Sequence, residues 1–133
     1  RFNIPPAVSL LKNVPLHEEK QILADPVRLK QILNNLINNA SKFTKEGSIT
    51  VGYHLNKPGF VTFFVEDTGI GISEDDQKHI FERFFKVNSF AQGTGLGLSI
   101  CHTIVERMHG TIQVTSQQGK GTCFTVRIPD TED

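Results

Sequence analysis

The chain has 133 residues, of which 38% are hydrophobic and 21% charged, as is typical of one globular domain with a buried core. Its 14 Lys and Arg residues balance 14 Asp and Glu residues, so net charge gives no attraction to nucleic acid or acidic membranes. No apolar run is long enough to cross a membrane, and Cys101 and Cys123 lack metal-type spacing. A reduced, cytosolic setting is the simpler interpretation. The first residue is Arg1, so we expect these residues to be a single domain, 1–133, of a longer protein.

The N-terminal third predicts strands at residues 7–11 and 21–24, followed by one long helix. Asp25 and Pro26 are good helix-starting residues, and the helix should run to about Phe43. Apolar residues recur in it at helical spacing. They are Leu29, Ile32, Leu33, Leu36, Ile37 and Ala40.

The remainder alternates hairpins and helices. Residues 48–55 and 60–66 alternate apolar and polar side chains, so they predict a hairpin turning at 56–59. A helix capped by Ser73 is expected over 74–84, and another over 97–109, stopped by Gly110. Residues 111–116 and 122–128 predict a second hairpin. The fold class is a two-layer α/β sandwich, with about three helices on one face of a mixed, mostly antiparallel sheet.

Four asparagines lie inside the first predicted helix, where asparagine is unfavourable. They are Asn34, Asn35, Asn38 and Asn39. Gln31, Asn35, Asn39 and Lys42 form one stripe, whose amide oxygens and ammonium suit Mg²⁺ with attached phosphates. A solvated face is the alternative. It is preferred for Asn34 and Asn38, while both interpretations stay open for Asn35 and Asn39.

Two glycine-rich loops follow. Asp67 ends a strand beside Gly69 and Gly71, so its carboxylate could accept a hydrogen bond from an adenine amino group. An ordinary Asx turn is the alternative, and the stronger one if this loop is taken alone. The second loop, residues 93–98, opens the helix expected at Gly97, and a helix start binds anions. It matches neither the dinucleotide fingerprint nor the P-loop.

Taken together, these segments resemble the catalytic and ATP-binding domain of sensor histidine kinases, within the ATPase superfamily that includes DNA gyrase and heat-shock chaperones. The resemblance covers roughly residues 20–130. Five boxes appear in family order: LKQILNNLINNASKFT (29–44), DTGIGI (67–72), IFERFF (80–85), GTGLGLSI (93–100) and GKGTCF (119–124).

The resemblance implies a role for each matching residue. Asn39 should ligate Mg²⁺, Asn35 and Lys42 should contact the phosphates, and Asp67 should bind the adenine amino group. Arg83 and Gln92 should approach the γ-phosphate, which makes Asn35, Lys42 and Arg83 the expected catalytic residues. The remaining expected nucleotide contacts are Gly69, Gly71, Ile72, Gly93, Thr94, Gly95, Leu96, Gly97, Leu98 and Thr122. Phe81 and Phe84 should pack the base of a mobile lid.

The resemblance also implies the reaction. The domain should bind ATP and Mg²⁺ and donate the γ-phosphate to a histidine on a separate dimerisation hairpin of a homodimeric parent protein. A response-regulator receiver domain should accept the phosphate next. None of the histidines lies in an acceptor-type motif, so we expect that hairpin outside these residues. A cytoplasmic domain is expected, with membrane anchoring of the parent left open.

Two departures from the family pattern qualify this expectation. Gln31 stands where hydrolytic relatives place a glutamate, and an amide cannot act as a general base, which favours transfer over hydrolysis. The segment between Phe85 and Gly93 is short, so weak nucleotide affinity is expected. A hydrolytic ATPase and a nucleotide-binding module without catalysis remain the rival functions.

Overall fold

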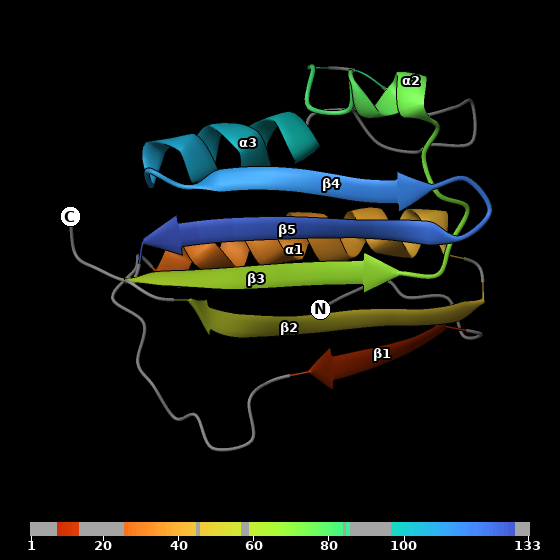
Figure 1. Cartoon of the computed structure of the whole chain (residues 1–133), viewed down its shortest axis with the longest axis horizontal. Helices are drawn as coiled ribbons and strands as arrows, with labels where there is room; N and C mark the ends of the chain where they lie inside the picture. Colours follow the sequence, from red (N-terminus) through yellow and green to blue (C-terminus); the bar gives the residue numbers. More distant parts are fainter. Residues whose placement is uncertain are drawn as a thin grey trace.

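The computed structural model describes residues 8–13, 26–44, 46–56, 59–83, 85 and 97–129. They form a five-stranded sheet, in the order β1-β2-β3-β5-β4, with helices packed against one face (Figure 1). The strands are β1 (Val8–Asn13), β2 (Gly47–Asn56), β3 (Phe60–Asp67), β4 (Thr111–Gln117) and β5 (Gly121–Pro129). The helices are α1 (Pro26–Phe43), α2 (Glu74–Gln77) and α3 (Gly97–Arg107). The predicted two-layer fold class is confirmed.

The sheet is mixed because β1 pairs parallel with β2, while every other neighbouring pair is antiparallel. Both predicted hairpins, β2–β3 and β4–β5, are present within one residue of their expected ends. The strand expected at 7–11 corresponds to β1. The strand expected at 21–24 and the Asp25 helix start lie outside the described residues.

Helix α1 buries the stripe that its sequence predicts. Ile32, Leu36 and Ala40 are almost fully buried, and they recur every four residues, so they lie on one face of the helix. This face packs with α3 and with the inner side of the sheet in one hydrophobic core (Figure 1). Single-domain organisation of residues 1–133 stays a prediction.

Alternation along the strands separates a core-facing side from an open side of the sheet. In β3, Val61, Phe63, Val65 and Asp67 are buried, while the residues between them are more exposed. Register aligns apolar residues of four strands beneath the helices. These are Val51, Val65, Phe124 and Val114. Where β3 ends and β5 begins, this apolar layer gives way to the polar side chains of Asp67 and Thr122.

The helix expected over residues 74–84 is wrong in its length. Ser73 caps it as predicted, accepting a hydrogen bond from the Asp76 backbone N–H at 3.1 Å, but α2 ends at Gln77. Tight turns follow, in which several backbone N–H groups bond a carbonyl three residues earlier, as from Glu82 to His79. These turns bring two adjacent side chains to the core. Ile80 is buried, and Phe81 packs edge-on against Phe124. A continuous helix would point neighbours about 100° apart.

Helix α3 is also slightly shorter than expected. It ends at Arg107 rather than His109, which adopts a positive φ of 64° just before Gly110. None of the helices in the described ranges combines the length and apolarity needed to span a membrane.

Candidate nucleotide site

A row of polar side chains crosses three neighbouring strands at one end of the sheet. Asp67 of β3 pairs in register with Thr122 of β5, which pairs with Ser116 of β4. Asp67 and Thr122 are only 4% and 5% exposed, although they are polar. We call Asp67, Thr122 and Ser116 the polar row. Buried polar groups are costly unless they are bonded, so this row marks a candidate site.

The Asp67 carboxylate is held by the loop that follows it. Its Oδ1 accepts the Gly69 backbone N–H at 2.8 Å. Burial raises the pKa of the carboxyl above its ordinary value, and the Gly69 and Thr122 backbone N–H groups oppose that shift. The bond from residue i+2 forms an Asx turn, which is the local geometry that the alternative interpretation expects. It uses one lone pair and leaves other acceptor positions of the carboxylate for a ligand.

A buried hydroxyl beside this carboxylate lacks a partner. Thr44 is fully buried, and its Oγ1 is the one buried side-chain polar atom in the described residues with no hydrogen bond. It lies close enough to the Asp67 carboxyl to lower its pKa, but not in hydrogen-bond geometry. Natural structures leave few such atoms, so a bound water or ligand atom fits this place.

The first glycine loop is wedged between two other backbone segments. The Ile70 N–H donates to the Phe43 carbonyl at 3.1 Å, and the Ile70 carbonyl accepts the Gly119 N–H at 2.7 Å. A Cβ at Gly69 would lie 2.1 Å from the Phe43 carbonyl oxygen, and Gly71 has φ of 76°. Glycine is therefore required here for close backbone packing, which shapes the floor beside Asp67.

The asparagine stripe, made of Gln31, Asn35, Asn39 and Lys42, runs along α1, and its Asn35 lies where α1 meets α3. Asn35 and Asn39 are half-buried, whereas Lys42 and Gln31 are exposed. The Cys101 thiol of α3 donates to the Ile32 carbonyl at 3.6 Å and lies beside the Asn35 side chain. Burial raises the pKa of the Cys101 thiol to about 11, so this cysteine is structural.

The asparagine oxygens fit a Mg²⁺ ion that is bound mainly by phosphates and water, rather than one bound by protein ligands alone. Within the described ranges, no three His, Cys, Asp or Glu side chains gather to hold a metal ion. Asparagine oxygens remain as hard ligands, and Mg²⁺ usually takes one or two protein ligands plus phosphates and water. Asn39 as a ligand stays a prediction.

Of the other residues expected to contact the nucleotide, the structure describes only some. Ile72 is buried at the polar row, Gly97 begins α3, and Leu98 packs against the core. Arg83 is exposed in the turns after α2, so its approach to a γ-phosphate stays a prediction. Gln92, Gly93, Thr94, Gly95 and Leu96 lie outside the described residues, as does Phe84.

Sequence reasoning missed Ser116 and Thr44. In the sequence, Thr44 is distinguished only as the last residue of the segment 29–44. Ser116 could have been found from the hairpin, because a turn over residues 117–121 sets it opposite Thr122. Ser116 and Thr122 form a polar pair next to the turn on an otherwise apolar face of the hairpin, and this pair indicates a site.

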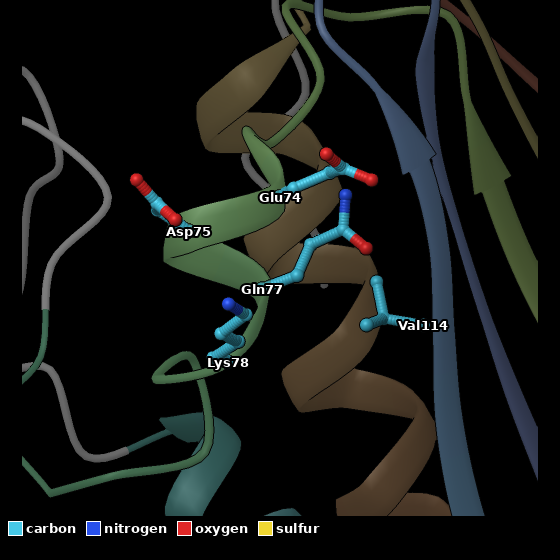
Figure 2. Close-up of a pocket in the computed structure, with 5 residues that line it drawn as sticks. All are labelled: Glu74, Asp75, Gln77, Lys78 and Val114. Atoms are coloured by element: carbon cyan, nitrogen blue, oxygen red, sulfur yellow. The ribbon is translucent and has the colours of Figure 1, made fainter.

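A hollow of 390 Å³ lies beside α2 and is lined by Glu74, Asp75, Gln77, Lys78 and Val114 (Figure 2). None of the expected nucleotide contacts lines it. The Gln77 side chain extends from α2 toward β4, as Figure 2 shows, and its amide nitrogen donates to the Ile72 and Ser116 carbonyls at 2.8 and 3.1 Å. The helix thereby fastens the glycine loop to the strand that carries Ser116.

Comparison with known families supports a nucleotide site. Residues 24–132 match the family described as histidine kinase-, DNA gyrase B-, and HSP90-like ATPase. The chain is 41% identical over 133 residues to the aerobic respiration control sensor protein ArcB of Escherichia coli, covering 96% of this chain and 16% of ArcB. It is 45% identical over 115 residues to the virulence sensor protein BvgS of Bordetella bronchiseptica, covering 80% of this chain and 9% of BvgS. It therefore spans a small part of each.

Solved structures share the fold. Full-length ShkA in complex with AMPPNP superposes with a TM-score of 0.82 at 36% identity, covering 93% of this chain and 26% of ShkA. The nucleotide-free catalytic domain of histidine kinase ThkA gives a TM-score of 0.80 at 31% identity, covering 94% of this chain and 82% of that domain.

Proposed function

The chain belongs to the family of histidine kinase-, DNA gyrase B- and HSP90-like ATPases, as a histidine kinase catalytic domain, and from this premise we propose how it works. It binds ATP with Mg²⁺ and donates the γ-phosphate to a histidine on a separate dimerisation hairpin. The observation that carries this proposal is the buried carboxylate of Asp67, set in a polar row beside the unpartnered Thr44 hydroxyl.

This arrangement suits the adenine end of the nucleotide. A buried carboxylate whose pKa is raised by burial is stabilised by a ligand donor that approaches its open lone pairs. The adenine amino group is such a donor. The AMPPNP in the ShkA structure shows that one relative of this fold binds an adenine nucleotide analogue, which supports the assignment.

The asparagine stripe suits the triphosphate end. Asn35 and Asn39 offer amide oxygens along one face of α1, and Lys42 follows at its end. Bound Mg²⁺ would neutralise phosphate charge, and Lys42 would add a positive point charge. The protein's contribution is then chiefly positioning and electrostatic stabilisation.

The transfer step is a simple exchange of bonds. The γ-phosphorus forms a bond to an imidazole nitrogen of the acceptor and loses its bond to the bridging oxygen, which leaves with ADP. The exposed amide Gln31 offers no general base for water, so transfer is favoured over hydrolysis. A response-regulator receiver aspartate would take the phosphate next, and the parent protein would act as a homodimer.

A phosphotransfer assay tests the proposal. The chain is mixed with ATP labelled at the γ-phosphate and with a separately supplied acceptor-histidine hairpin. We expect label on the hairpin that is labile to acid, and none on a hairpin whose acceptor histidine is replaced by glutamine. Release of free phosphate without labelled hairpin would favour the hydrolytic rival. ATP binding with neither product would favour a module without catalysis.

A further inference from the structure

The Ser116 hydroxyl lies at the β4 end of the polar row and meets three groups. The Ile72 backbone N–H donates to Ser116 Oγ at 2.8 Å. Ser116 Oγ donates to the Gly121 carbonyl at 2.8 Å and lies 2.9 Å from Thr122 Oγ1. Ser116 thus joins the first glycine loop to the last motif of the chain.

Only one assignment of donors and acceptors satisfies all of these contacts. A backbone N–H can only donate, and a backbone carbonyl can only accept. Ser116 has one hydroxyl hydrogen, and the contact with the Gly121 carbonyl requires it. The hydrogen between Ser116 and Thr122 must therefore belong to Thr122. As a result, the Thr122 hydroxyl keeps only lone pairs for any other partner.

Thr122 lies directly beside the carboxylate expected to bind the base. The two residues face each other in the β3–β5 register, and the Thr122 backbone N–H supports the Asp67 carboxyl. An ionised carboxylate also offers only lone pairs. Together, Asp67 and Thr122 present a wall of acceptors with no hydrogen to donate.

We propose that Ser116 is a positioning residue for base selection, which turns the Thr122 hydroxyl into an acceptor so that this wall admits a 6-amino purine and rejects a 6-oxo purine. The inference rests on the proposed nucleotide function. A 6-amino group offers hydrogens to the wall, whereas a 6-oxo group sets its own lone pairs against it. Without Ser116, the Thr122 hydroxyl could rotate and donate to the oxo group.

Ser116 is itself held in place on both sides. The Gln77 amide nitrogen bonds the Ser116 carbonyl at 3.1 Å and the Ile72 carbonyl at 2.8 Å. Because the loop and the strand are fastened together, the Ser116 hydroxyl cannot easily leave the Ile72 N–H. The orientation of Thr122 is therefore built into the fold before any ligand binds.

Calorimetric titration with ATP and with GTP, both with Mg²⁺, tests the inference on the chain and its variants. The readout is the ratio of the GTP to the ATP dissociation constant. Ser116→Ala should lower this ratio by about three- to tenfold, the factor of one neutral hydrogen bond. Ser116→Thr, which keeps the hydroxyl, should retain the wild-type ratio. Thr115→Ala, at an exposed position of the same strand, is the matched control and should also retain it.

A second background separates positioning from general support of the fold. In Thr122→Val the hydroxyl that Ser116 orients is gone, so adding Ser116→Ala should lower the ratio no further. Ser116→Cys, with a weakly bonding thiol, provides the same test if the alanine variant does not fold.

Three results would overturn the inference. One is an unchanged ratio in Ser116→Ala, and another is an equal fall with and without the Thr122 hydroxyl. The third is a wild-type chain that binds both nucleotides equally or neither, and this result alone would also refute the proposed adenine site.

Discussion

Replacing Asp67 with asparagine keeps the shape of the side chain and removes its charge. The amide oxygen can still accept the Gly69 N–H, which lies 2.8 Å from Oδ1 in the wild-type chain. The amide nitrogen then offers hydrogens where the base amino group would donate. A hydrogen bond to a charged group contributes about 1.5–3 kcal/mol, so the ATP dissociation constant should rise by about ten- to hundredfold.

The same substitution changes how stability depends on pH. Burial raises the pKa of Asp67 above 3.8, so the folded chain holds this proton more tightly than the unfolded chain. Its stabilising contribution is present below pH 3.8 and is lost as pH rises through the raised pKa. Asparagine does not titrate. The unfolding free energy of the wild type minus that of Asp67→Asn should therefore fall across this window.

Two assays check these expectations. Calorimetry with ATP and Mg²⁺ gives the affinity, and urea unfolding at a series of pH values gives the stability difference. Glu66→Gln is the matched control, because Glu66 is an exposed neighbour on the open side of the sheet and should leave the affinity unchanged. An unchanged affinity in Asp67→Asn would refute the adenine assignment. A stability difference that rises with pH would refute the burial argument.

Three further changes have defined outcomes. Asn39→Ala should abolish the tightening of ATP binding by Mg²⁺ in calorimetry, whereas Asn38→Ala, at an exposed position, should retain it; equal Mg²⁺ effects would exclude the ligand role. The Cys101 thiol, with a pKa of about 11, should be about one-thousandth ionised at pH 8, so iodoacetamide should alkylate it far faster in urea than in the folded chain. Gly121→Ala places Cβ 2.0 Å from a backbone carbonyl oxygen at φ 121° and should cost about 3 kcal/mol or more in urea unfolding, against about 1 kcal/mol for Gly119→Ala, where φ is 84° and nothing lies within 4 Å. Similar costs for the two would contradict the close-packing argument.

The parts of the fold that sequence predicted well are those with a clear period. Helix α1 and both hairpins bury one face each, and apolar spacing in the sequence encodes that face. The segment after Ser73 was harder, because its cap and first turn do signal a helix. Tertiary packing of Ile80 and Phe81 then replaces helix with successive turns, and no local pattern reports such packing.

The sequence predicted those parts of the candidate site in which a single motif residue shows its role without neighbours that are distant in sequence. Asp67 was identified from its place at a strand end, and its burial supports that choice. Ser116 and Thr44 contribute through neighbours that are distant in sequence, so only strand register and helix packing bring them to the site. The choice between a solvated and a ligand-binding face also depends on packing that the sequence does not show, because Asn35 lies beside Cys101 of α3 and both Asn35 and Asn39 are half-buried.

Calorimetric titration of the chain with ATP, with and without Mg²⁺ and with GTP as the control, is the sharpest test of the nucleotide site. We expect Mg²⁺-dependent binding that favours ATP. Binding of neither nucleotide, or equal binding of both, would contradict a site built on the Asp67 carboxylate and the asparagine stripe.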